Sequence, residues 1–365
     1  MKSFDEIFVD KTKYGVKVQT TEYSEVGEHI IIDQGQSQIA GYTDRQEGLF
    51  EEVPVVIFGD HTRVIKYVDE PFFLGADGVK VLRSKDDNAN YKYLYYALKN
   101  ARIPDTGYNR HFKWLKEVQI NYPDSDKQAE IVDILDNVSS VIKKREDELC
   151  VLDDLIKARF VEMFGDPYVN PKGWIECALS EKLNLVGGYA FKSDMFDENG
   201  GIPVLRIGNI NTGYFKPIKL VYWQEDENLE RYAMHPGDLV MSLTGTVGKD
   251  DYGNVCILGD EYEMYYLNQR NAKLEIKEGI DKFYLSQLLK FDQIKKKLTG
   301  ISRGVRQANI SNKDILNLVV PVPPIELQNQ FAAFVNQVDK SKVVVQKALD
   351  ETQILFNSLM QQYFG

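Results

Sequence analysis

Few residues in this 365-residue sequence have the types and spacing that catalysis needs. The segment GTVGKD, residues 245–250, resembles the end of a phosphate-binding loop, but Leu243 stands where its first glycine is required and Asp250 where Ser or Thr is required. Asp60 and His61 could form an acid–base pair, but no nucleophile motif accompanies them, so we interpret them as part of a polar loop. The four histidines lack the spacing of metal ligands. The sequence therefore predicts no catalytic centre and no bound metal.

The chain carries an internal repeat with an offset of 200 residues, which continues without a gap over more than fifty positions. It places FKWLKEVQINYPDSDKQAEIV, from Phe112, against NKDILNLVVPVPPIELQNQFAAFV, from Asn312. A weaker match upstream pairs FFLGADGVKVL, from Phe72, with YYLNQRNAKLE, from Tyr265. Each copy is thus predicted to be a variable region followed by a well-matched segment.

The well-matched segments have the heptad pattern of long helices, although Arg145 and Arg159 occupy the apolar stripe of the first and weaken it. The first, over about residues 125–164, would be roughly 60 Å long at 1.5 Å per residue. Ser125 and Gln128 have capping-box spacing at its start. Two unrelated amphipathic helices are the alternative, but the shared register and length favour mutual packing. The first helix leads from the first variable region to the second, so a partner that leaves the second must run back, and the pair is predicted to be an antiparallel coiled-coil spacer. The predicted packing residues are Ile131, Leu135, Val138, Ile142, Leu149, Leu152, Ile156, Phe331, Val335, Val338, Val345, Leu349 and Phe356.

The variable regions read as short strands broken by turn residues, among them 53–60 and 202–210, with helical patterns at 91–99 and 282–297. The predicted fold class is therefore α+β, a tandem repeat with pseudo-two-fold symmetry. The predicted domains are 1–122 and 167–322 for the variable regions, and 123–166 and 323–365 for the long helices.

Composition sets further bounds. The net charge of −11 argues against nucleic acid as a partner, because phosphate binding rests on Lys and Arg. That charge is an average, and eleven acidic residues against six basic ones lie between Asp124 and Glu162, within the first predicted helix. No run of eighteen apolar residues predicts a membrane span, and the N-terminus lacks the apolar core of a signal peptide. Three scattered cysteines predict no disulfide framework, so we expect a cytoplasmic protein.

The order of variable region, proline turn and long helix, present twice, resembles the DNA-specificity subunit of type I restriction-modification systems. The segments at 30–44, 55–82 and 239–249 are similar to recurrent phrases of that family's target-recognition domains, and VPVPPIELQNQFAAFV, at 320–335, is similar to its proline-proline turn and helix. The family usually has Glu-Gln where this chain has Leu327-Gln328, a departure that bears on partner contacts. The resemblance covers the whole chain.

The resemblance implies a non-catalytic subunit whose two target-recognition domains read a bipartite DNA sequence, with the helices measuring the unread gap. It also implies two modification subunits that methylate adenine N6 with S-adenosylmethionine. Restriction subunits that use ATP and Mg²⁺ are further implied partners. No cofactor is expected in this chain.

Residues suited to DNA contacts are polar and basic side chains in predicted loops, since base edges are read by Arg, Lys, Asn, Gln and similar groups. Many such side chains in turns are merely solvated, which is the alternative for each. In the first region the candidates are Gln34, Gln36, Tyr42, Arg45, His61, Thr62, Arg63, Arg110, His111 and Lys113. In the second they are Arg206, Asn209, Asn211, Thr244, Thr246, Lys249, Arg303, Arg306, Gln307 and Asn309.

Other functions remain open at this point. A self-contained enzyme is disfavoured because neither Asn-Pro-Pro-Tyr nor Asp-Pro-Pro-Tyr, the adenine methyltransferase signatures, occurs. A coiled-coil scaffold without DNA function would not need two large, dissimilar regions with polar, Gly-rich loops. A DNA-recognition subunit of a methyltransferase-only system fits the sequence equally well.

Overall fold

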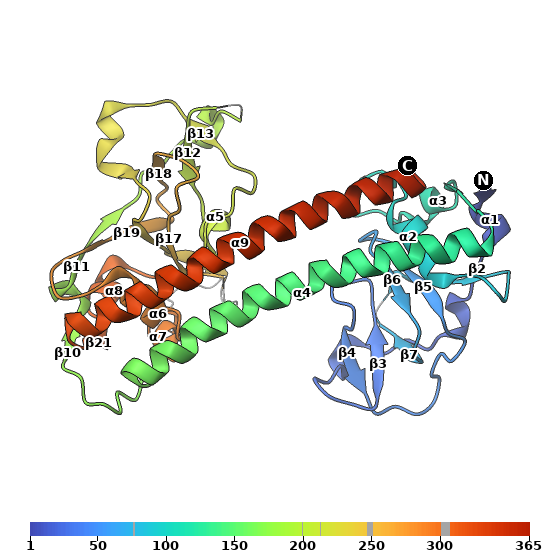
Figure 1. Ribbon diagram of the computed structural model, residues 1–365, viewed down its shortest axis with the longest axis horizontal. Coiled ribbons are helices and arrows are strands. Elements are labelled where there is room, and N and C mark those ends of the chain that lie inside the picture. Colours follow the sequence, from blue (N-terminus) through green and yellow to red (C-terminus); the bar gives the residue numbers. More distant parts are fainter. Residues whose placement is uncertain (76, 199, 212, 247–250, 301–306) are drawn as a thin grey trace. The chain divides into compact units, whose positions relative to one another are not determined.

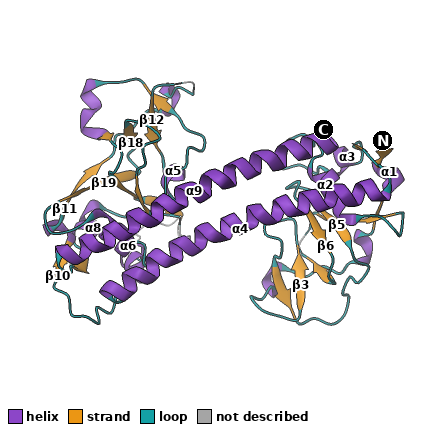
Figure 2. Cartoon of the chain, in the orientation of Figure 1, coloured by secondary structure: helices purple, strands orange, loops and turns teal. Residues whose placement is uncertain are grey.

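The computed structural model describes residues 1–365 except 76, 199, 212, 247–250 and 301–306. The chain forms two compact units, unit 1 from Met1–Asp147 with Val345–Gly365, and unit 2 from Glu148–Val344. Both units mix helices with strands (Figure 2). The boundaries between the two units fall within the two long helices, so each helix belongs partly to each unit. The division of the chain into four domains at residues 122, 166 and 322 remains a prediction.

The described part of unit 1 has two larger sheets and the short antiparallel pair β1-β9. An antiparallel sheet has the strand order β2-β8-β5-β6, and a smaller one has the order β4-β3-β7, in which β3 and β7 run parallel. The elements of unit 1 before its long helix are β1 (Lys2–Ser3), α1 (Phe4–Ile7), β2 (Phe8–Asp10), β3 (His29–Ile32), β4 (Gly41–Thr43), β5 (Val55–Gly59), β6 (Ile65–Val68), β7 (Phe72–Leu74), β8 (Val79–Ser84), α2 (Tyr91–Lys99), α3 (Phe112–Leu115) and β9 (Gln119–Ile120).

Strand β5 explains why the two sheets of unit 1 pack as they do. All five of its residues are buried. Val55 and Ile57 enter one hydrophobic core with the smaller sheet, whereas Val56 and Phe58 enter another with α2. Successive side chains of a strand point to opposite faces, so a continuous apolar run is required where both faces are covered.

Unit 2 repeats this topology. Its main sheet has the order β11-β19-β15-β17, and its second sheet, β13-β12-β18-β14, again contains a parallel pair, β12 with β18. Its elements are β10 (Glu176–Ala178), β11 (Leu183–Gly187), β12 (Ile202–Leu205), α5 (Ile207–Ile210), β13 (Tyr222–Trp223), β14 (Ala233–Met234), β15 (Leu239–Ser242), β16 (Thr244–Thr246), β17 (Val255–Ile257), β18 (Tyr265–Leu267), β19 (Asn271–Ile276), α6 (Lys282–Leu289), α7 (Asp292–Thr299), β20 (Gln307–Asn309), α8 (Asn312–Leu316) and β21 (Val319–Pro321).

The long helices are α4 (Ser125–Phe164) and α9 (Ile325–Phe364). In unit 1, Ile131 near the start of α4 shares a core with Met360 near the end of α9. In unit 2, Phe160 near the end of α4 shares a core with Phe331 near the start of α9. The helices therefore run antiparallel, as predicted, and Figure 1 shows them side by side.

Burial along the helix pair follows the heptad stripe with one drift. Phe160 is fully buried and its ring contacts Phe331, although the stripe had assigned Arg159 to this turn. A straight helix of 3.6 residues per turn drifts from a 3.5 repeat, which explains the shift by one position. Of the predicted packing residues, Ile131, Leu135, Ile156, Phe331, Val335, Val338, Val345 and Phe356 are buried, and Val138, Ile142, Leu149, Leu152 and Leu349 are half-buried.

Three local predictions need correction. Residues 282–297 form two helices, α6 and α7, because the chain turns between Leu289 and Asp292. Residues 207–210, expected to continue a strand, form the short helix α5. Asp124 caps α4 by accepting from the backbone N–H of Lys127 at 2.9 Å, so the expected cap, Ser125, is already the first helical residue.

Candidate nucleic-acid interface

In unit 1, Gln34 joins three loops. Its Nε2 donates to the carbonyl of Asp77 at 2.8 Å, and its Oε1 accepts from the backbone N–H of His61 at 3.1 Å. The hydroxyl of Thr62 donates to the carbonyl of Gln34 at 2.6 Å. Both ends of the Gln34 amide are thus engaged, so Gln34 and Thr62 position the loops, while the neighbouring Gln36 is exposed.

An aromatic stack projects from these loops. The rings of His61 and Tyr108 are stacked with centroids 4.8 Å apart and planes 9° from parallel. Tyr108 is 88% exposed, and Nδ1 of His61 is buried without a hydrogen-bond partner among the described residues. The sequence prediction omitted Tyr108, although the turn GYNR, which ends in the exposed Arg110, offered a signal. An exposed ring two residues from an exposed arginine suits contact with nucleotides.

Arg63 is held by the loop that precedes this stack. Its guanidinium pairs with the carboxylate of Asp105 at 2.6 Å and donates to the carbonyl of Ile103 at 3.3 Å. The backbone N–H of Gly107, together with Arg63, keeps the pKa of Asp105 below its usual value. Since Asp105 already neutralises it, Arg63 fixes the 103–107 loop in this structure.

His111 is not placed to touch DNA, and this prediction is corrected. Its side chain is fully buried, with Nδ1 donating to the carbonyl of Asp60 at 3.0 Å and Nε2 accepting from the hydroxyl of Thr106 at 3.3 Å. The carboxylate of Asp60 accepts from the backbone N–H of Phe112 at 2.8 Å, which supports the polar-loop interpretation of Asp60 over acid–base chemistry. Lys113 remains exposed, with its ammonium 4.1 Å from the ring centroid of Trp114.

Tyr42 lies in β4, an edge strand of unit 1's smaller sheet, and Arg45 follows that strand. Tyr42 is half-buried within β4, opposite Ile30 of β3. Arg45 is exposed just after that strand, and its Nε donates to the carbonyl of Glu47 at 3.1 Å. Arg45 is therefore the more accessible of the two.

In unit 2, a two-stranded ribbon joins two predicted clusters. Strand β16 pairs with β20 so that Thr244 faces Asn309 and Thr246 faces Gln307. Sixty residues of chain separate these strands, so only the fold reveals that the clusters are one surface. Lys249, Arg303 and Arg306 lie outside the described residues.

Asn209 serves the local fold, which corrects the expectation that it faces DNA, whereas Arg206 is half-buried and remains a predicted contact. Asn209 is buried, and its Nδ2 donates to the carbonyls of Lys216 and Ile218 at 2.9 and 3.0 Å. Its Oδ1 accepts from the backbone N–H of Arg206 at 3.0 Å. The Arg206 guanidinium bonds to the carbonyl of Lys219. Together they close the 206–219 loop.

A polar hollow lies beside the ribbon. It is lined by Ile207, Asn211, Thr244, Gly245, Thr246, Asp251 and Arg270. Three predicted residues, Asn211, Thr244 and Thr246, meet here. Arg270 was missed, although the weaker repeat aligns its turn with that of Asp77 in unit 1.

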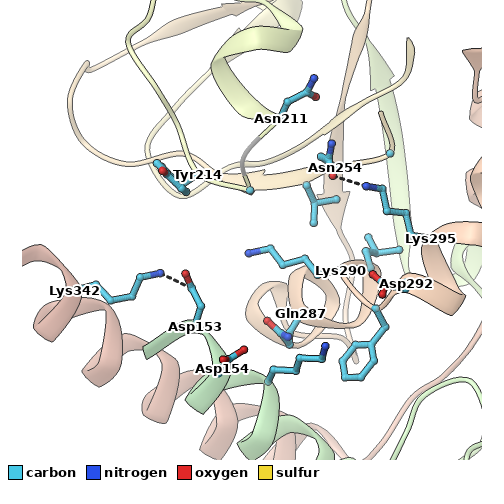
Figure 3. Close-up of a pocket in the computed structure, with 16 residues that line it drawn as sticks. Asp153, Asp154, Asn211, Tyr214, Asn254, Gln287, Lys290, Asp292, Lys295 and Lys342 are labelled. Carbon is cyan, nitrogen blue, oxygen red and sulfur yellow. Dashed lines mark hydrogen bonds and ion pairs between the residues drawn. The ribbon is translucent and has the colours of Figure 1, made fainter. Parts of the chain in front are cut away.

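A second recess of unit 2 lies between α4, α9 and the α6–α7 turn (Figure 3). Lys342 pairs with Asp153 at 2.7 Å across the two long helices, and Lys295 donates to the side-chain oxygen of Asn254 at 2.7 Å. With Asp154, Asp292 and Lys290 also present, the walls carry both signs. The arrangement stabilises the helix contact and shows no nucleophile with an adjacent base.

Over the described ranges, no three His, Cys, Asp or Glu side chains gather as metal ligands. Within those same ranges, no helix has the length and apolar character to cross a bilayer. The three cysteines are free thiols.

Comparison with known proteins identifies the fold and the family. A family model described as type I restriction modification DNA specificity domain matches residues 10–150 and 171–352. The type I restriction enzyme MjaVIII specificity subunit of Methanocaldococcus jannaschii is 26% identical over 316 residues, covering 77% of this chain and 72% of that protein. The type I restriction enzyme EcoR124I/EcoR124II specificity subunit of Escherichia coli is 30% identical over 151 residues, covering 38% of this chain and 37% of that protein.

A solved structure supports the same fold. The type I restriction-modification system S subunit from M. genitalium superposes with a TM-score of 0.55 and 18% identity, covering 100% of this chain and 95% of that chain. The duplicated sheets, the antiparallel helices and the two matched domain copies agree with one another. The chain therefore belongs to the family of type I restriction-modification DNA-specificity subunits.

Proposed function

We propose that this chain reads a DNA target in two parts, one part by each unit, and that it has no catalytic activity of its own. The observation that carries the proposal is the duplicated topology with dissimilar loop residues at equivalent places. Unit 1 offers His61, Tyr108 and Arg110, whereas unit 2 offers the β16–β20 ribbon and Arg270. Equal scaffolds with unlike surfaces suit two unlike half-sites.

The unread gap between half-sites would be set by the helix pair. Helices α4 and α9 are each continuous over 40 residues and each takes part in both units. Two paired helices of that length are stiff. They would fix the distance between the readers, as the geometry of a dimer fixes half-site spacing in other DNA-binding proteins. The gap length is therefore expected to follow the helix length.

The helix pair is also the proposed docking surface for two modification subunits. Leu155 of α4 and Leu355 of α9 are related by the 200-residue offset, and they are 45% and 50% exposed. Because the two leucines lie at equivalent positions of the repeat, a partner that contacts one is expected to contact the other, which suits two modification subunits. The modification subunits would supply adenine-N6 methylation with S-adenosylmethionine, and restriction subunits would supply ATP- and Mg²⁺-dependent cleavage. The complex would act on cellular DNA in the cytoplasm.

Mapping N6-methyladenine across the source genome, with and without the gene for this chain, tests the proposal. Methylation at one bipartite sequence should vanish when the gene is deleted and return when it is restored. Methylation of a continuous target, or a map that does not change, would contradict the proposal. The purified chain alone should show no methyltransferase, nuclease or ATPase turnover.

A further inference from the structure

We propose that the hollow beside the β16–β20 ribbon receives an exocyclic amino group of a DNA base, namely adenine N6 or cytosine N4, in the half-site read by unit 2. The hollow is lined chiefly by Asn211, Thr244, Asp251 and Arg270. This inference rests on the proposed function and assigns the chemistry of one of its reading sites.

Asn211 presents a hydrogen-bond acceptor whose direction is fixed. Its Nδ2 donates to the carbonyl of Asp251 at 2.8 Å, which determines which end of the amide is the oxygen. Its Oδ1 is buried and has no hydrogen-bond partner among the described residues. A buried acceptor left unpaired is unfavourable, so a site that supplies a donor on binding gains that bond.

Thr244 adds a second unpaired polar atom, a hydroxyl oxygen that can also accept a hydrogen bond. Its Oγ1 is also buried and has no partner within the described part of the chain. Pairing of Thr244 with Asn309 holds the strand, and the backbone N–H of Leu243 donates to the carbonyl of Arg270 at 2.8 Å. The hydroxyl, the amide oxygen and the Arg270 turn are thus positioned by a common backbone frame.

The acceptor atoms of the hollow select the ligand. The Asp251 carboxylate accepts from the backbone N–H and the hydroxyl of Thr246 at 2.7 and 2.9 Å, so it is fixed in the wall. The Arg270 guanidinium lines the same hollow, so charge alone does not select the ligand. The Asn211 oxygen, which has no partner among the described residues, requires an N–H donor and cannot pair with a base carbonyl or a phosphate oxygen. A Cβ on Gly245 would lie 2.2 Å from Oδ1 of Asp251, so a larger residue at this position would displace that carboxylate.

In the major groove, exocyclic amino groups are carried by adenine and cytosine, whereas guanine and thymine present carbonyl acceptors. The exposed Arg270 is then available for the neighbouring acceptor on the same edge, or for a phosphate. Asn211 and Thr244 would therefore bind the amino group of a base while Arg270 binds the neighbouring acceptor. The hollow would then distinguish one base from another and not only contact the DNA backbone.

Binding of base analogues by the complete methyltransferase complex tests this assignment. Once the target is mapped, each adenine of the unit 2 half-site is replaced by purine and each cytosine by 2-pyrimidinone, which lack the amino group. For the wild type, one replacement should weaken binding by about 10-fold. In Thr244→Val and Asn211→Ala that penalty should shrink to about 2-fold or less, while Thr244→Ser should retain it.

The half-site read by unit 1 is the internal control, because its analogue penalties should be equal in all four proteins. Which analogue is penalised distinguishes adenine from cytosine. Equal penalties in wild type, Thr244→Val and Asn211→Ala, or no penalised analogue in the unit 2 half-site, would overturn the assignment while leaving two-part reading intact. A wild-type complex with no sequence preference would instead refute the proposed function itself.

Discussion

Gln328 donates a hydrogen bond from its side-chain amide to the carbonyl of Pro323 at 2.7 Å, and so closes the turn that starts α9. Its repeat counterpart, Gln128, makes the same bond to Pro123 at 2.8 Å at the start of α4. Gln328 alone also accepts, through Oε1, from the backbone N–H of Asp281 at 2.8 Å. The second copy therefore ties its long helix to α6 as well.

This difference predicts unequal stability losses. Gln328→Leu removes the bonds to Pro323 and Asp281 and a longer one, of 3.5 Å, to the carbonyl of Gly279, and should lower the free energy of unfolding by about 2–4 kcal/mol. Gln128→Leu removes the bond to the carbonyl of Pro123 and should cost about 1–2 kcal/mol. Urea denaturation of both variants and the wild type measures the ratio. Equal losses would mean that the Asp281 bond contributes nothing.

Charge removal at the exposed edge of unit 1 should weaken DNA binding in a salt-dependent way. For Arg110→Gln and Lys113→Gln we expect weaker binding and a salt slope smaller by about one per lost phosphate contact. Affinity measured at several salt concentrations tests this. Lys99→Gln, on α2 beside the long helices, is a matched control. Slopes unchanged in both variants would remove these residues from the interface.

Replacement of residues 1–122 by the corresponding region of another family member should change one half-site only. The reason is that unit 2 keeps its sheets, its ribbon and its hollow when the first region is exchanged. Methylome mapping of the chimaera reads both halves at once. If both halves changed together, the two readers would not be independent.

One heptad inserted into both α4 and α9 should lengthen the unread gap by about 3 base pairs, since seven helical residues add about 10 Å and DNA rises about 3.4 Å per base pair. Both half-sites should stay the same. A heptad inserted into one helix alone shifts the packing register and should destabilise the protein instead. An unaltered gap in the double insertion would rule out the measuring role.

Thiol labelling should separate the cysteines. Burial raises the pKa of Cys256 to about 12, and its side chain is fully inaccessible, whereas Cys150 is exposed on α4. Because the thiolate is the reactive form, Cys150 should react at pH 8 while Cys256 stays protected until the protein unfolds. The raised pKa also means that stability from Cys256 is present below its unfolded pKa and declines as pH rises toward 12. Thiol labelling followed by peptide mapping measures the reaction of each cysteine. Fast reaction of Cys256 in the folded protein would contradict its burial.

Much of the architecture was readable from sequence because it depends on local periodicity. The 200-residue repeat and the heptad spacing predicted both long helices and their antiparallel pairing, and α2 coincides with the predicted 91–99. Strand β5 was likewise predicted from its apolar run. These signals are carried by neighbouring residues, so no knowledge of distant contacts is needed.

The candidate site was only partly readable, because polar residue types do not reveal their partners. His111 and Asn209 look like DNA contacts in sequence, yet both are buried and bonded to backbone within their own unit. The sequence prediction omitted Tyr108 and Arg270, because each is a single residue in a turn. Exposure and hydrogen-bond satisfaction are properties of the folded chain, and they decide which polar groups are left for a ligand.

The sequence by itself determined the repeat, the helix lengths and the family, since each follows from spacing along one chain. Only the tertiary structure decided that Thr244 lies opposite Asn309 and that Asn211 and Arg270 border one hollow, because these residues meet through strand pairing and loop closure across tens of residues. Such long-range contacts depend on the packing of whole elements, and no local pattern encodes them.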